Sequence, residues 1–218
     1  MGSHSAVFLA ALLYFTLLPL QVKADPSPTV SYAQEFPGSD PEHYTITVSN
    51  NGHSGYQSDG KLGKQEEPGT IEEFDFVLSL GTTKQIFDLA KKAHYFQGEI
   101  DSKRKVASTG AKTLTYKDGG NETKATYNYS TIAAVQDLTK IFQDLSSTLE
   151  FGRRLQYYYH HQKLALNEEL TNMEDAQADH RLGDITPVVP ILNEIAKDPS
   201  VVNVARVRAM RIAATKVN

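Results

Sequence analysis

The chain has 218 residues, a formal charge of −4 at pH 7 and no cysteine. This length supports one ordinary hydrophobic core or two small ones without covalent cross-links, and the lack of cysteine excludes disulfides, thiol catalysis and thiolate metal sites. The acidic balance excludes no fold, but it makes nucleic acid a poor partner because phosphate binding needs a basic surface.

The first predicted element is an export signal. Residues 6–20 form one uncharged apolar run, and Val22-Lys23-Ala24 has the small-residue spacing of a cleavage site. We expect cleavage after Ala24, so that residues 1–24 are a signal peptide, with an uncleaved N-terminal anchor as the alternative. The run is shorter than the roughly 20 residues of a spanning helix, and no other stretch approaches that length. The pattern therefore predicts a periplasmic or extracellular protein with no membrane span after cleavage.

A short lead-in and a sheet domain are predicted next. Residues 25–41 contain four prolines and little apolar periodicity, which predicts a flexible, extended lead-in. The sheet domain is expected over residues 42–130. It begins with alternation from Tyr44 to Val48, the turn signal Asn50-Asn51-Gly52 and a return over residues 53–58, which together predict a β-hairpin.

Three further elements complete the predicted sheet domain. Apolar residues at alternate positions from Phe74 to Leu80 predict a third strand. A helix over residues 86–96, capped by Thr82-Thr83, is followed by a second hairpin over residues 112–129. Tight hairpins around one helix predict an antiparallel sheet with a helix packed on one face, which is the α+β class.

The stretches YTITVSNNGHSGY (44–56), IFDLAKKAHYF (86–96) and KTLTYKDGGNETKATYNY (112–129) carry a resemblance to a known family. Over about residues 42–150 the chain resembles a family of exported bacterial domains of unknown function, built as a hairpin, a helix, a second hairpin and a closing helix. The resemblance implies this fold and an exported location, and it implies no established activity.

A long helix is predicted over residues 131–180. Apolar positions step by four and three from Leu138 to Met173, and a single helix of this length would be on the order of 70 Å long. The sheet domain alone cannot cover such a helix. We expect a C-terminal helical hairpin over residues 181–218 to pack against it. The pairs Thr186-Pro187 and Asp198-Pro199, each a cap residue before a proline, predict the starts of its two helices. A second copy of the chain, as in a coiled coil, is the alternative.

The run of three tyrosines and two histidines over residues 157–161 is the part of the sequence that most resembles a metal or catalytic site in composition. On a helix, His160 and His161 point about 100° apart, and neither has a histidine or carboxylate three or four residues away. We therefore predict no metal site here. Aromatic groups on most sides of a helix favour packing or a partner-binding patch, and the candidate partner-binding residues, expected to be most exposed, are Tyr157, Tyr158 and His161.

No motif identifies a catalytic residue, a metal ligand or a cofactor. The patterns Gly-x-Ser-x-Gly, His-Glu-x-x-His and Gly-x-Gly-x-x-Gly and the P-loop are all missing. The favoured hypothesis is a non-enzymatic interaction or scaffold module that binds a protein partner or itself. Two alternatives stay open: a hydrolase or metal-dependent enzyme that assembles distant histidines with a carboxylate, and a small-ligand binder on the sheet face. Their candidate residues are His43, His53 and His94 for the first, and Tyr116, Tyr127 and Tyr129 for the second.

Overall fold

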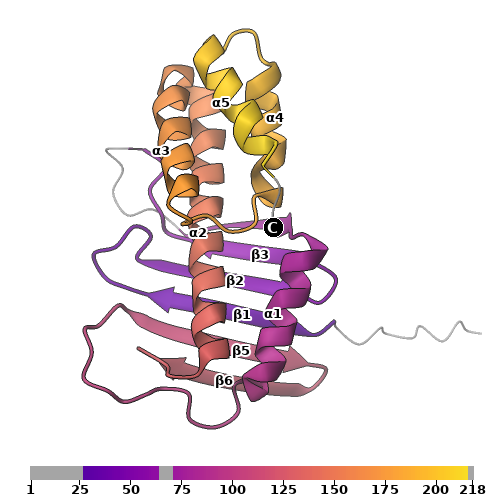
Figure 1. Cartoon of the computed structure of the whole chain (residues 1–218), viewed down its shortest axis with the longest axis vertical. Coiled ribbons are helices and arrows are strands. Elements are labelled where there is room, and N and C mark those ends of the chain that lie inside the picture. Colours follow the sequence, from indigo (N-terminus) through magenta and orange to yellow (C-terminus); the bar gives the residue numbers. More distant parts are fainter. Residues whose placement is uncertain (1–26, 64–70, 216–218) are drawn as a thin grey trace, which may run out of the picture.

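Six antiparallel strands form one open sheet, and the helices of the described residues lie on one side of it (Figure 1). The computed structural model describes residues 27–63 and 71–215, so the predicted signal peptide lies outside the described residues. The α+β class is confirmed. In spatial order the strands are β4 (Glu72–Val77), β3 (His53–Ser58), β2 (His43–Ser49), β1 (Thr29–Glu35), β5 (Ala111–Asp118) and β6 (Asn121–Tyr127).

Strand β1 corrects the predicted lead-in. The segment Thr29–Glu35 pairs with β2 on one side and with β5 on the other, so it lies in the middle of the sheet. Val30 and Tyr32 alternate with polar residues and are fully buried. Pro28 and Pro37 flank the strand without interrupting it, because a proline outside the strand removes none of its ladder hydrogen bonds. The prolines on both sides led to the prediction of a lead-in, although Thr29–Glu35 has the alternating pattern of a strand.

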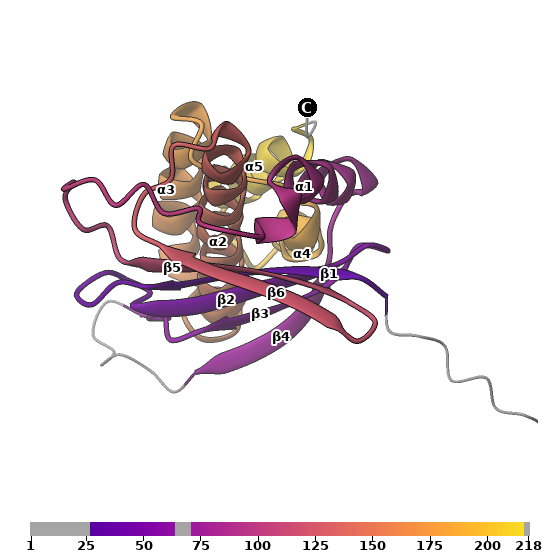
Figure 2. The same cartoon turned by 90° about the horizontal axis from the view of Figure 1, so that it is seen from below.

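Two helices cover one face of the sheet, as Figure 2 shows: α1 (Leu80–Lys92) and the first half of α2 (Ala133–His161). Helix α1 begins earlier than predicted because Ser79 is its N-cap. The Ser79 hydroxyl accepts a hydrogen bond from the backbone N–H of Thr82 at 3.2 Å. Leu80 is therefore the first residue of this helix and does not belong to the third strand.

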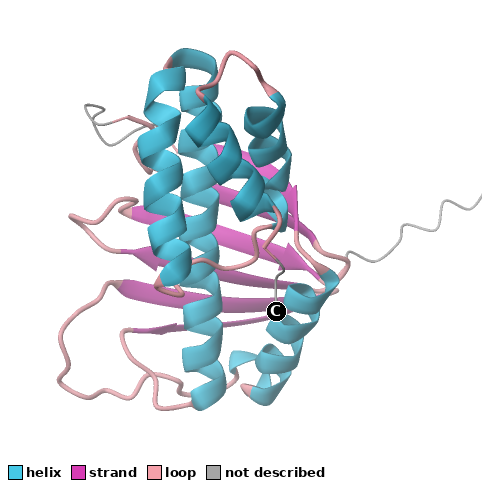
Figure 3. Cartoon of the chain, turned by 45° about the horizontal axis from the view of Figure 1, so that its top comes forward, coloured by secondary structure: helices cyan, strands magenta, loops and turns pink. Residues whose placement is uncertain are grey.

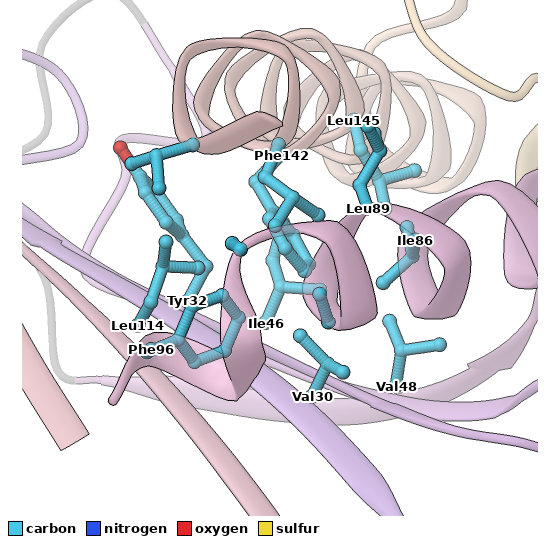
Figure 4. Packing of buried hydrophobic residues seen from close by; sticks show 14 of the residues in the cluster. Val30, Tyr32, Ile46, Val48, Ile86, Leu89, Phe96, Leu114, Phe142 and Leu145 are labelled. Carbon is cyan, nitrogen blue, oxygen red and sulfur yellow. The ribbon is translucent and has the colours of Figure 1, made fainter. Parts of the chain in front are cut away.

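The first hydrophobic core lies between the sheet and these two helices (Figure 4). The ring of Tyr32 on β1 stacks on that of Phe142 on α2, with centroids 5.2 Å apart and planes 4° from parallel. Ile46 and Leu114 from the neighbouring strands are fully buried in the same core. Helix α2 therefore packs directly on the central strands, and this packing fixes its position over the sheet.

Helix α2 does not continue to residue 180, so the prediction of one long helix was wrong. It ends at His161, and Gln162 has a non-helical backbone (φ −148°, ψ 62°). A short turn, η2 (Lys163–Ala165), then leads into α3 (Leu166–Ala178), which runs back beside the far half of α2 (Figure 1). This reversal places Leu155 and Leu166 in the same second hydrophobic core, where both are fully buried.

The predicted C-terminal helical hairpin is confirmed over its described part. It consists of η3 (Thr186–Val188), α4 (Val189–Lys197) and α5 (Asn203–Ala213), which complete the second core (Figure 3). Gly183 brings the chain back across α2, where its N–H donates to the Asp144 carbonyl at 3.0 Å. In residues 27–63 and 71–215, no helix is both long and apolar enough to cross a membrane.

Candidate functional site

A cleft of about 440 Å³ lies where the two cores meet, and we call it the junction cleft. The C-terminal half of α2 forms its floor, the edge strand β4 forms one wall, and η3 with the start of α4 forms the other. Its volume falls within the range of pockets that bind small ligands or single peptide side chains. The walls are mainly apolar, and their apolar members are Leu62, Phe74, Leu149, Pro187, Val188, Pro190 and Ile191.

Gly152 lets the floor and the second wall come together. A Cβ atom at this position would lie 2.6 Å from Cγ1 of Val188, which is closer than real Cβ contacts. The glycine that interrupts the apolar heptad pattern thus marks the place where η3 packs directly on the backbone of α2. The cleft opens beside this contact.

A buried ion pair on α2 lies at the floor of the cleft. Arg153 Nη1 lies 2.9 Å from Glu150 Oε2, and both side chains are almost fully buried. The Glu150 carboxylate also accepts hydrogen bonds from the hydroxyls of Tyr56, at 2.8 Å, and Ser58, at 2.7 Å. Arg153 Nη2 donates to Glu72 Oε2 at 2.8 Å, and this bond ties α2 to the edge strand β4.

The electrostatics of this cluster hold Arg153 charged and Tyr56 neutral. Burial alone would lower the pKa of Arg153, but the charge of Glu150 and the hydrogen bond to Glu72 outweigh it and raise the pKa. Burial, reinforced by the charge of Glu150, raises the pKa of Tyr56 well above its ordinary value. The arginine stays charged and the tyrosine stays neutral near pH 7. These groups therefore position the cleft and are poorly suited to proton transfer.

The cleft contains two of the three predicted partner-binding residues. Tyr157 is half-buried and His161 is exposed, both line the cleft, and their rings lie 4.9 Å apart. Tyr158 is only 6% exposed and belongs to the second core, so the prediction that it is exposed was wrong. The reason is that Leu155 and Tyr158, three residues apart on one helix face, turn toward α3 and α4.

Sequence reasoning missed several residues of the cleft. Gln156 and His160 lie on its rim, where Gln156 Nε2 is 2.9 Å from His160 Nε2. Glu150 and Arg153 lie three residues apart on the buried face of α2, a spacing of opposite charges that could have marked them as a pair. Nothing in the sequence marks the contribution of Glu72, because it comes from a distant strand.

The histidines of the enzyme hypothesis are not brought together. His43 pairs with Asp59 through a 2.6 Å contact at one end of the β2–β3 hairpin, whereas His53 begins β3 at the other end. His94 lies in η1 (His94–Phe96), which packs beside β5 and β6. Within the described ranges, no three histidine, aspartate or glutamate side chains are placed to hold a metal ion.

The tyrosines of the small-ligand hypothesis separate as well. Tyr127 and Tyr129 line a hollow of about 290 Å³ together with Lys112. Tyr116 instead packs on Tyr95, with ring centroids 4.4 Å apart. This hollow therefore holds two of the three tyrosines, and it lacks the apolar walls of the junction cleft.

Comparison of the chain with models of protein families finds no match. Comparison with curated proteins finds no match either.

Proposed function

We propose that this protein is an exported, non-enzymatic interaction module that binds an apolar segment of a partner protein in the junction cleft. One observation carries the proposal: the cleft gathers apolar side chains from three distant parts of the chain under an aromatic and polar rim. Burial of apolar area supplies about 25 cal/mol per Å², and a few polar groups at the mouth fix orientation. A cleft of this composition is suited to binding.

The chemistry of the cleft favours binding over catalysis. Arg153 lines the cleft but is paired with Glu150 and Glu72, and the ring of His160 is engaged by Gln156. A general base needs a free, suitably tuned group within reach of a substrate proton, and a nucleophile needs an adjacent base. Of the described lining residues, His161 alone offers an imidazole that hydrogen-bonds to no other described side chain, and the pairing of the other polar groups favours binding.

The walls also indicate how a partner would be held. Pro187 and Pro190 have no backbone N–H, so this wall cannot extend a β-ladder to an incoming strand. The occupant would be anchored by apolar side chains, with hydrogen bonds from Gln156 and His161 at the mouth. An apolar side chain on an otherwise extended peptide fits this description.

The exported location is part of the proposal and rests on the sequence. The apolar run over residues 6–20 and the site after Ala24 support it, as does the resemblance over about residues 42–150 to exported bacterial domains. Cell fractionation and mass spectrometry test this part directly. The expected result is a periplasmic or secreted protein whose first residue is Asp25.

Peptide selection tests the binding function. A phage-displayed library of random peptides is selected on residues 25–218, and enriched peptides are measured by titration. We expect peptides that share an apolar anchor and lose binding at least ten-fold to Gln156→Trp, which fills the cleft from its rim. Asp137→Trp places the same side chain on an exposed part of α2 outside the cleft and is the matched control. Peptides that bind Gln156→Trp as well as the unchanged chain would rule out this site.

A further inference from the structure

The second face of the sheet carries no helix in the described part of the chain (Figure 2). Its side chains form cross-strand rows that follow from the strand register. One complete row runs across all six strands through Asp75, Gly55, Thr47, Ser31, Thr115 and Lys124. The row beside it runs through Glu73, Gln57, Thr45, Ala33, Thr113 and Thr126. We call the surface made by these two rows the open face.

Two pairs of small polar residues on the open face hydrogen-bond to each other, one on the central strands and one toward the β6 edge. The hydroxyl of Ser31 lies 3.0 Å from that of Thr47, and the hydroxyls of Thr113 and Thr126 are also 3.0 Å apart. Covering a hydroxyl that already has a partner costs less than covering one that depends on water. These paired hydroxyls can therefore be covered by another flat surface at a modest desolvation cost.

The two edges of the open face carry opposite charges. Glu73 and Asp75 lie on β4 at one edge, and Lys124 lies on β6 at the other. All three are exposed, and none forms an ion pair with another described residue. Lys117 and Glu122, which flank the rows, pair with each other at 3.2 Å. The open face is thus acidic at one end, basic at the other and uncharged between.

We propose that two copies of this chain pack through their open faces about a two-fold axis that runs along the strands. A rotation about such an axis lays β4 of one copy over β6 of the other, because the strand order reverses. Asp75 and Lys124 end the same row, so each Asp75 then faces the Lys124 of the second copy. An axis across the strands would lay acid on acid.

A hollow at the acidic end fits this arrangement. It measures about 470 Å³ and is lined by residues of β2, β3 and β4, among them Gln57, Glu73 and Asp75. Gly55 lies at its centre in the row and leaves the backbone uncovered by a side chain. In the proposed dimer the long Lys124 side chain of the second copy enters this hollow and meets the two carboxylates.

The available area indicates a weak dimer. The two rows occupy about four residues on each of six strands, and with strands about 4.8 Å apart and residues about 3.4 Å apart they offer roughly 400 Å² per copy. The total of about 800 Å² is typical of weak, transient interfaces. Because area alone does not set affinity, we expect only that the dimer forms at micromolar concentrations or above.

Sedimentation equilibrium of residues 25–218 over a concentration series tests the dimer. The unchanged chain should dimerise, and Asp75→Lys or Lys124→Glu should each weaken dimerisation about ten-fold or more, because each places two like-charged pairs across the interface. The combined variant Asp75→Lys with Lys124→Glu should restore it. Lys92→Glu, an equal charge change at an exposed position on α1, should leave it unchanged.

Two results would overturn the proposal. One is a monomer throughout the concentration series, which would leave the open face to solvent or to a different partner. The other is a combined variant that is no better than its parents, because the paired charges would then not face each other. The junction cleft lies on the opposite, helix-covered side, so Gln156→Trp should leave dimerisation unchanged, and the two proposals fail separately.

Discussion

At the scale of single residues, the buried cluster under the cleft depends on Gly60. A Cβ atom at Gly60 would lie 2.8 Å from Cδ of Glu150 and 3.0 Å from Nη1 of Arg153. Arg153 also donates to the Gly60 carbonyl at 3.3 Å, so the backbone here is itself part of the cluster. In the sequence Gly60 belongs to a polar loop, and only the fold shows that a side chain has no room.

We expect Gly60→Ala to lower the free energy of unfolding by about 1–3 kcal/mol, the usual cost of forcing a methyl group into a filled site. Urea denaturation measures the effect. Gly120→Ala is the control, because no atom lies within 4 Å of the Cβ position at Gly120. Equal midpoints for the two variants would show that the loop can move away from Glu150 at little cost.

His43 is the residue from which we expect a measurable pH response. Its hydrogen bond to the Asp59 carboxylate raises the pKa of His43 above its ordinary value of 6.5. A raised pKa means that the protonated form is favoured in the folded chain. The stabilisation is therefore fully present below about pH 6.5 and is lost as the pH rises through the raised pKa.

An NMR titration of the His43 ring tests this expectation. The pKa should lie above 6.5 in the unchanged chain and should fall in Asp59→Asn, which removes the charge but keeps the shape. Asp88→Asn on α1 should leave the pKa of His43 unchanged, because Asp88 pairs with Lys84 on the helix. A His43 pKa that does not respond to Asp59→Asn would show that the contact does not persist in solution.

At the scale of elements, helix α2 is held to the sheet edge by one buried cation. Arg153→Met would leave Glu150 buried without its counter-charge, and we expect a loss of about 3–5 kcal/mol in the free energy of unfolding. Adding Glu150→Met should recover part of this loss, because it removes the unpaired charge but takes the carboxylate acceptor from the hydroxyls of Tyr56 and Ser58. Lys140→Met removes an exposed ion pair with Asp144 on the same helix and should cost less than about 1 kcal/mol. A double variant as unstable as Arg153→Met would contradict this account.

The elements that sequence could predict are those with local signals. The two hairpins have turn residues between alternating strands, and the C-terminal helices follow prolines that mark their starts. The reversal at Gln162 has no such signal, because no glycine or proline lies there and the heptad pattern continues through it. What ends α2 is the gain from packing α3 against it, which is a tertiary effect.

The candidate site was less predictable than the fold. Its floor lies on α2, but its walls come from Leu62, β4 and η3, which are distant in sequence. The aromatic run over residues 157–161 contains two residues that line the cleft, Tyr157 and His161. Which of the neighbouring tyrosines would be buried depended on where α3 and α4 pack, and helical spacing alone does not contain that information.

At the scale of the whole molecule, α2 spans both hydrophobic cores and β1 lies at the centre of the sheet. Removing β1 therefore takes away two strand pairings at once, together with the buried Val30 and Tyr32. We expect a chain that starts at Glu42 to fail to fold, and a chain that starts at Asp25 to fold fully.

Amide NMR spectra and thermal denaturation compare the two truncated chains. The chain from Asp25 should give dispersed signals and a cooperative transition, whereas the chain from Glu42 should give neither. A chain from Glu42 that unfolds cooperatively would show that β2 and β5 can close the sheet without the strand between them.

The position of β1 also sets an order of events during synthesis. One of its edges pairs with β2, the next strand along the chain. The other edge stays unpaired until β5, which begins only at Ala111, has been synthesised. Until that residue has emerged, Thr29–Glu35 presents a row of unpaired N–H and C=O groups beside apolar side chains. Such an edge is a template for pairing with another nascent chain. The interval between the emergence of β4 and that of β5 is when this chain is most prone to aggregate, and when a chaperone that shields strand edges would help it most.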